Sequence, residues 1–261
     1  MGWLFTDFFL VWKNGDKDYS FFTWASIDNP YFPKETYESE KRKLPPEEFA
    51  RRYMGEFKKM SGLIYDLPKE QIIAPIENLD AKAEVRLMGI DWGFRNPSAI
   101  SVLYLYDKAW YIVDEWKQEE RTTEEILQVA NNKITEHRIL RVYPDPAQPE
   151  RLEEARRKGI PMYPANKDVR GGISFLRAAI FEKRFFVYNT CRETLSEMSM
   201  YHWMDQKIPT FEKDPKEQPQ KFNDHLMDAM RYAIYSYKPQ SQVIQQSKPT
   251  LPFYGDSEIP F

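Results

Sequence analysis

The sequence has little of what several protein classes require. Cys191 is the only cysteine in 261 residues, so an intrachain disulfide is impossible and a cysteine-rich zinc site is excluded. No run approaches the ~18 apolar residues of a membrane span. The start of the chain lacks the basic region and the small-residue cleavage site of a signal peptide. We therefore expect an intracellular protein that has no membrane partner.

The chain as a whole also lacks an excess of positive charge. The sequence has 37 Lys and Arg against 40 Asp and Glu, a formal net charge of -3, which gives no overall sign of nucleic-acid binding. Residues 150–184 are a local exception, with nine basic against five acidic residues. Most of these charges are typical of solvated helix faces. Lys167 and Arg170 precede a helix that opens at Gly171, where backbone amides can meet a phosphate, so we expect these two to contact DNA.

Residues 1–80 differ in pattern from the rest of the chain. Aromatic residues at 8–12, a polar turn and a second aromatic run at 19–24 predict a β-hairpin. Two charged helices are expected next, at about 34–43 and 45–55. This is too little for a convincing independent core, so we interpret residues 1–80 as a small N-terminal appendage or linker.

The pattern of residues 81–238 is typical of an α/β domain. Strands that follow one another directly, and then strands that alternate with helices, predict a mixed β-sheet flanked by helices. We expect residues 207–221 to form a long loop or a flexible hairpin, and the Pro-, Gln- and Ser-rich residues 239–261 to be disordered. The expected strands are 84–91, 98–106, 109–116, 139–143, 160–163 and 185–188, and the expected helices are 122–137, 149–158, 169–183, 191–203 and 222–237.

Two carboxylates are expected at the ends of buried strands. Asp91 follows an apolar run and precedes a Trp-Gly turn, and Asp145 follows another apolar run and lies between two prolines. Strand ends of open α/β sheets hold side chains rigidly at the solvent edge, where ligands and metals bind. Each acid also has a simpler interpretation, because Asp near Gly caps hairpins and Asp-Pro is a common turn former.

The last helix carries a third group of acids. Asp224 and Asp228 lie four residues apart on one face, with His225 adjacent. Asp224 could serve only to favour the helix dipole, but that does not explain Asp228 one turn further on. Clustered carboxylates repel one another unless a cation lies between them. Oxygen ligands without cysteine select Mg²⁺ or Mn²⁺, and two such ions can drive phosphodiester hydrolysis without a nucleophilic side chain.

The motifs GIDWGFRNPSAI, YPDPAQPE, NKDVRGGISFLRAAI, CRETLSEMSMY and above all NDHLMDAMRYA resemble the nuclease domain of the large terminase subunit of tailed bacteriophages. The resemblance implies an RNase H-like fold and a metal-dependent endonuclease that cuts concatemeric double-stranded viral DNA during packaging. It also implies that Asp91, Asp145 and Asp228 form the metal-binding acidic triad, with His225 beside the metal site and Asp224 as a possible auxiliary ligand.

Residues 1–80 are similar to the end of the ATPase domain of the same family. No G-x-x-x-x-G-K-[ST] phosphate loop occurs in the sequence, so we expect no ATP hydrolysis through such a site. The family resemblance further implies that the partners are viral DNA, the small terminase subunit and the portal or procapsid, in the cytoplasm of the host bacterium.

Two other interpretations stay open at this point. The GIDWG motif resembles the first phosphate loop of actin-like and sugar-kinase ATPases, although the second acidic segment, PDPAQP, lacks the glycine that such a fold needs. Alternatively, the domain could be non-catalytic and only dock to DNA or the portal. Three clustered acids argue against this second alternative, because unneeded ones would only destabilise the fold.

Overall fold

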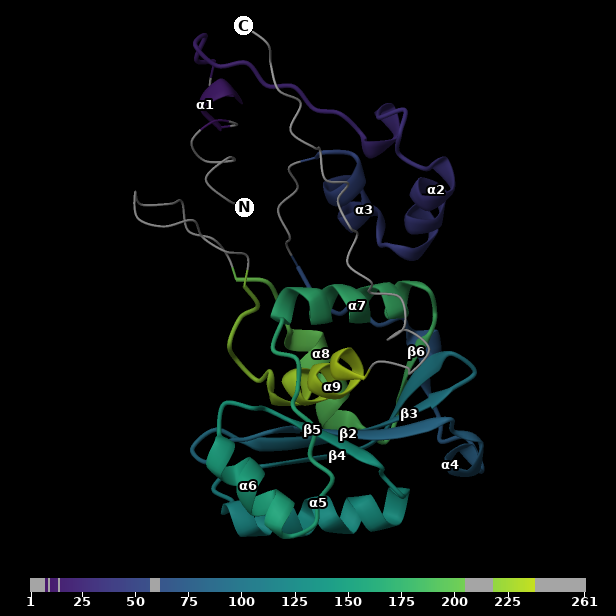
Figure 1. Ribbon diagram of the computed structural model, residues 1–261, viewed down its shortest axis with the longest axis vertical. Coiled ribbons are helices and arrows are strands. Elements are labelled where there is room, and N and C mark those ends of the chain that lie inside the picture. Colours follow the sequence, from purple (N-terminus) through teal and green to yellow (C-terminus); the bar gives the residue numbers. More distant parts are fainter. Residues whose placement is uncertain (1–7, 9, 14, 57–61, 205–217, 238–261) are drawn as a thin grey trace, which may run out of the picture.

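A computed structural model describes residues 8, 10–13, 15–56, 62–204 and 218–237. Its centre is one mixed sheet of six strands in the order β1-β6-β4-β3-β2-β5 (Figure 1). The middle strands β2, β3 and β4 are antiparallel, whereas β5 is parallel to β2, β6 to β4, and β1 to β6. The strands are β1 (Ile72–Ile73), β2 (Val85–Asp91), β3 (Ser98–Tyr106), β4 (Ala109–Gln118), β5 (Arg141–Pro144) and β6 (Phe185–Tyr188).

Helices cover both faces of this sheet. In Figure 1, α5 (Thr123–His137) and α6 (Pro149–Arg157) lie on one face, and α7 (Val169–Phe181), α8 (Arg192–Met200) and α9 (His225–Ser236) lie on the other. The predicted mixed sheet with helices on both faces is therefore confirmed. None of the helices in the described residues is long and apolar enough to cross a membrane.

Local sequence signals explain the main elements. β2 and β3 are nearly continuous apolar runs because helices bury them from both sides, and Leu87, Ile90 and Val102 are fully buried. The predicted capping box starts α5: Glu125 N donates to Thr122 Oγ1 at 3.3 Å, and Thr122 N donates back to the Glu125 carboxylate at 2.8 Å. These signals are local, which is why the sequence predicts them well.

The predicted N-terminal hairpin is wrong. Leu10–Lys13 forms a short helix, α1, and residues 19–25 are irregular. The two segments still lie together, because Phe8 packs on Tyr19 and Trp12 packs on Phe21. Side-chain packing therefore joins the segments that the pattern suggested would pair through their backbones.

The predicted strand at 160–163 is reduced to a single bridge between Val142 and Met162. Val142 N donates to Pro161 O, but Pro161 itself has no N–H to continue a ladder. The remaining short elements are η2 (Ser26–Asp28), η3 (Lys69–Gln71) and α4 (Leu79–Lys82).

The region before the sheet contains the predicted helices, α2 (Lys34–Lys43) and α3 (Pro46–Tyr53), which share a small core of Tyr37, Leu44 and Phe49. Arg52 of α3 donates to Ser174 of α7 at 2.8 Å and joins this unit to the larger one. Ile64 and Tyr65 pack in the core of the sheet. The division of the chain at residues 80 and 238 stays a prediction, and the disorder expected at 239–261 and most of the loop expected at 207–221 lie outside the described residues.

Candidate metal centre

Asp91 and Asp145 lie at adjacent strand ends. β2 and β5 are parallel, with Ile90 opposite Pro144, so the next residue of each strand is an aspartate at the same edge of the sheet. Asp145 N donates to Ile90 O at 2.9 Å, and Trp92 Nε1 donates to Asp145 O at 3.2 Å. These backbone and indole contacts fix the two acids beside each other, as expected from the sequence.

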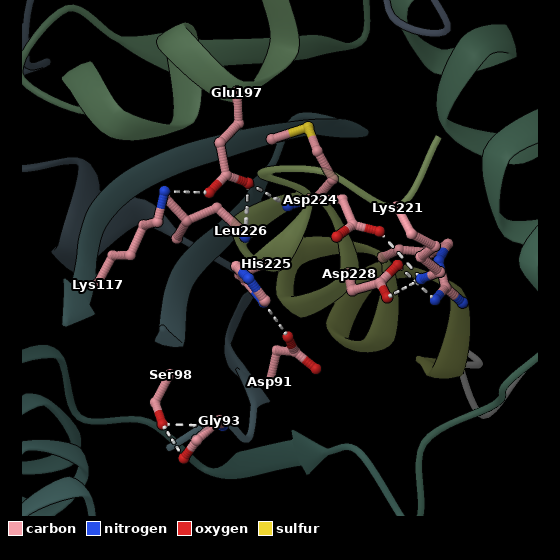
Figure 2. A network of polar contacts seen from close by, with 12 residues as sticks. Asp91, Gly93, Ser98, Lys117, Glu197, Lys221, Asp224, His225, Leu226 and Asp228 are labelled. Atoms are coloured by element: carbon pink, nitrogen blue, oxygen red, sulfur yellow. Dashed lines mark hydrogen bonds and ion pairs between the residues drawn. The ribbon is translucent and has the colours of Figure 1, made fainter. Parts of the chain in front are cut away.

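α9 brings the third acid to the same place because it crosses β2 at very close range. A Cβ added to Gly89 would lie 1.8 Å from Ala229 O, so only glycine allows this approach. The contact places the first turn of α9, which carries His225 and Asp228, above the end of β2. His225 Nδ1 lies 2.9 Å from Asp91 Oδ2 (Figure 2).

These side chains line one cavity of about 750 Å³. Its walls carry four aspartates and one histidine: Asp91, Asp145, Asp224, Asp228 and His225. The same cavity is lined by five basic residues, which are Arg95, Arg151, Lys167, Lys221 and Arg231. In Figure 2 the carboxylate of Asp91 meets His225, whereas those of Asp224 and Asp228 are turned toward Lys221.

Cationic side chains already hold these carboxylates. Lys221 Nζ lies 3.0 Å from Asp224 Oδ2 and 3.1 Å from Asp228 Oδ2. Lys167 Nζ lies 2.9 Å from Asp145 Oδ1. The Lys221 ammonium therefore bridges two carboxylates at the mouth of the cavity, which shows that this arrangement of oxygens stabilises a cation.

Arg231 supplies a second, buried positive charge. Only 1% of its surface is exposed, and its Nη2 donates to Asp228 Oδ1 at 2.8 Å. The glycine pair of α7 makes room for it, because a Cβ at Gly172 would lie 2.6 Å from Arg231 Cγ. At Gly171, a Cβ would lie 2.2 Å from the Tyr235 hydroxyl. These glycines thus serve the packing of α7 on α9.

Burial dominates the electrostatics of Asp91. Burial and, to a smaller extent, the charges of Asp228 and Asp145 raise the pKa of this carboxyl, and the hydrogen bond with His225 opposes them. The resulting pKa is about 6. The pKa of His225 is raised in turn, chiefly by its hydrogen bond to Asp91. The pKa shift of Asp91 therefore comes chiefly from burial, and that of His225 chiefly from its contact with Asp91.

The residues expected at the site from the sequence are divided between two places. Asp91, Asp145, Asp228, Asp224, His225 and Lys167 line the cavity described above, whereas Arg170 lines a separate, smaller one between α3 and α7. Sequence reasoning missed Lys221 and Arg231. A signal for Arg231 was present, since an arginine three residues after Asp228 on a helix lies beside it.

Another acidic cluster lies on the opposite face of the sheet. Among the described residues, only Asp114, Glu136 and His137 bring three ligand atoms all within 4.8 Å of one another. Asp114 is already paired with Lys133 and with His137 Nε2. The acids of the cavity described above do not meet this spacing criterion.

Comparison with known proteins identifies the family. Residues 88–236 match the family described as Terminase RNaseH-like domain. The chain is also 30% identical over 230 residues, 82% of its length, to the large terminase subunit of Escherichia phage T5. The chain belongs to the large terminase family. Its mixed sheet is therefore an RNase H-like sheet, and the resemblance seen in its motifs is confirmed.

Solved structures of large terminases share this fold. The large terminase of a thermophilic bacteriophage superposes with a TM-score of 0.73 and 26% identity, over 90% of this chain and 61% of that one. The nuclease domain of the P22 large terminase gives a TM-score of 0.52 and 25% identity, over 66% of this chain and 90% of that one. A more distant nuclease domain, that of the bacteriophage SPP1 large terminase with bound Mn, shares the fold at 16% identity, with a TM-score of 0.52 over 65% of this chain and 98% of that one.

The chain spans about half the length of the curated large terminases that it matches, 52% of the phage T5 protein and 45% of the Salmonella phage P22 protein. The part that it covers contains the RNase H-like domain of the family and the residues that precede it.

Proposed function

We propose that this chain carries the nuclease of a large terminase, a divalent-metal-dependent endonuclease that cuts concatemeric double-stranded viral DNA. One observation supports this most strongly: Asp91 and Asp145 at two strand ends and Asp228 on α9 line the same cavity. Membership of the large terminase family and the likeness to the P22 nuclease domain point to the same chemistry.

The residues present fit Mg²⁺ or Mn²⁺. Carboxylate oxygens are the ligands that these hard cations prefer, and the Lys221 ammonium already lies between two of them. Asp91, Asp145 and Asp228 would hold two ions, with Asp224 as an auxiliary ligand and His225 beside them. When bound, the ions would activate a water and stabilise the leaving oxygen of the phosphodiester.

Other residues of the chain prepare the acids for this task. His225 fixes the orientation of Asp91 through its 2.9 Å contact. The buried Arg231 guanidinium compensates the negative charge of Asp228 through its hydrogen bond to Oδ1. A phosphate backbone is bound mainly by Lys and Arg. Lys167 at the cavity wall is proposed as one phosphate contact, and Arg170 in the neighbouring cavity as a second.

The wider role that we infer is that of the family. In it, the chain would act on viral DNA together with the small terminase subunit and the portal or procapsid, in the cytoplasm of the host bacterium. No phosphate loop occurs in this sequence, so the nuclease is proposed to work here without ATP turnover.

Incubation of the protein with supercoiled plasmid tests the proposal. We expect nicking and linearisation with Mn²⁺ or Mg²⁺, and none when excess chelator is present. Asp91→Asn, Asp145→Asn and Asp228→Asn should each abolish cutting while circular dichroism stays unchanged, and Asp224→Asn should have a milder effect. Cleavage that persists in chelator, or that is absent with either metal, would contradict the proposal.

The same purified protein can be used to test the two alternatives suggested by the sequence. An actin-like ATPase predicts saturable ATP binding by calorimetry, whereas the nuclease proposal predicts none. A module that only docks to DNA predicts a DNA gel shift without any cutting.

A further inference from the structure

The first turn of α9 is capped in an unusual way. Asp224 is the N-cap residue of α9, and an aspartate at this position normally accepts a hydrogen bond from the second or third amide of its helix. Within the described part of the chain, the Asp224 side chain caps no amide of α9. Its carboxylate is instead turned to the cavity, where it meets Lys221 at 3.0 Å.

Glu197 of α8 takes this role from a distance of 29 residues in the sequence. Its Oε2 accepts hydrogen bonds from Leu226 N at 2.8 Å and from Met227 N at 3.3 Å (Figure 2). These are the second and third residues of α9, the same amides that an N-cap side chain would satisfy. Glu197 of the neighbouring helix α8 therefore caps α9 in place of Asp224, the N-cap residue.

Glu197 is buried, with 1% of its surface exposed. A buried carboxylate is costly unless it is paired and hydrogen-bonded. Here Lys117 of β4 supplies the charge, with its Nζ 2.8 Å from Glu197 Oε1. The capping group is thus attached both to the central sheet and to α8, and it holds the start of α9 at a fixed position relative to β4.

We propose that Glu197 is a positioning residue of the metal centre. By capping α9 from α8, it leaves the Asp224 carboxylate available to a metal ion. It also fixes the turn that carries His225 and Asp228. This inference rests on the proposed metal-dependent function, because the release of Asp224 from capping serves the site only if Asp224 binds a metal ion.

A double-mutant cycle between Glu197→Ala and Asp224→Ala tests the proposal by two measurements that do not involve catalysis. The first is Mn²⁺ affinity by calorimetry. Without Glu197, Asp224 turns back to cap α9, so we expect each single variant to lose affinity about 10-fold or more, as outer-shell changes at metal sites do. The double variant should bind Mn²⁺ no more weakly than Asp224→Ala alone.

The second measurement is the melting temperature in chelator, and its expected pattern is the opposite. Each single variant keeps one group able to cap α9, so the melting temperature of Asp224→Ala should fall by less than about 3 °C. That of Glu197→Ala should fall further, because this change also removes the 2.8 Å ion-pair partner of Lys117. The double variant loses both groups, so its fall should exceed the sum of the two single falls. Glu197→Gln, which keeps an acceptor oxygen, should retain most of the affinity for Mn²⁺.

Glu193→Ala is the matched control. Glu193 lies one turn earlier on α8 and is 3.8 Å from the same Lys117 Nζ, but it is largely exposed, so its removal should leave Mn²⁺ affinity unchanged. If Glu197→Ala does not fold, hydrogen exchange on Asp224→Ala decides: the amides of Leu226 and Met227 should keep their protection because Glu197 still caps them.

The failure of this inference can be distinguished from the failure of the proposed function. Wild-type protein that binds no Mn²⁺ contradicts the function. Wild-type protein that binds Mn²⁺ while Glu197→Ala or Asp224→Ala binds it equally well overturns the positioning role. Loss of amide protection at Leu226 and Met227 in Asp224→Ala also overturns it, because the cap would then belong to Asp224.

Discussion

Gly89 of β2 lies directly against Ala229 of α9, so closely that a Cβ at residue 89 would come within 1.8 Å of the Ala229 carbonyl oxygen. This contact joins the strand that ends in Asp91 to the helix that carries Asp228. Because Gly89 has no Cβ, α9 can approach β2 closely, and this approach sets the distance between Asp91 and Asp228.

Gly89→Ala should separate α9 from β2. We expect a destabilisation of about 1–3 kcal/mol from overpacking and a large loss of Mn²⁺ affinity, measured by thermal melting and by calorimetry. Gly159→Ala is a suitable control, because Gly159 has a φ of +76° and open space around it; it should lower the melting temperature without changing Mn²⁺ affinity. Unchanged metal binding by Gly89→Ala would contradict this account of the geometry.

Lys221→Met should strengthen metal binding. The Lys221 ammonium lies 3.0 and 3.1 Å from oxygens of Asp224 and Asp228, so a metal ion must displace it to reach both. We expect a lower melting temperature in chelator, because the carboxylates lose a counterion, and a several-fold higher Mn²⁺ affinity by calorimetry. Lys158→Met, which removes an ion pair with Glu154 on α6, should change neither. Weaker Mn²⁺ binding by Lys221→Met would mean that the lysine assists the metal rather than competing with it.

Asp91→Asn should stabilise the protein in chelator at neutral pH. Burial raises the folded-state pKa of Asp91 to about 6, from an ordinary value of 3.8. A carboxyl whose pKa is raised by folding stabilises the fold below its unfolded pKa, and this contribution is lost as the pH rises through the folded pKa. Above pH 6 the ionised Asp91 therefore lowers the stability of the folded state, and asparagine removes this destabilising charge.

The expected result in chelator is a melting temperature at or above that of the wild type at pH 7.5, with the difference shrinking as the pH falls from about 6 to 4. With Mn²⁺ the order should reverse, because a ligand that binds the native state stabilises only the protein that can bind it. If Asp91 only caps a turn, Asp91→Asn should melt lower at every pH and should gain as much from Mn²⁺ as the wild type does.

The parts of the site that the sequence predicts are those fixed by local signals. Asp91 and Asp145 each follow an apolar run that predicts a buried strand, and Asp228 lies in the first turn of an amphipathic helix. The fold class follows from the same signals, since strands that alternate with helices require parallel neighbours in a covered sheet.

The missed parts depend on contacts between distant segments. The expectation that the helix opening at Gly171 meets a phosphate could not include Arg231, which is 59 residues from Gly172 in the sequence and packs against it. The predicted N-terminal hairpin had the right aromatic pattern, but ring packing such as that of Trp12 on Phe21 satisfies it without strand pairing. In both cases the residue types indicated that the segment packs closely against something, but the sequence did not indicate which residue it packs against.

The central claim is that Asp91, Asp145 and Asp228 hold a pair of divalent metal ions. It is tested most directly by a crystal grown or soaked with Mn²⁺ and measured for anomalous scattering at the manganese edge. We predict two anomalous peaks ~3.5–4 Å apart among these three carboxylates, with Lys221 displaced from Asp228. Peaks only at Asp114, Glu136 and His137, or none within reach of the three aspartates in a crystal with accessible cavities, would contradict it.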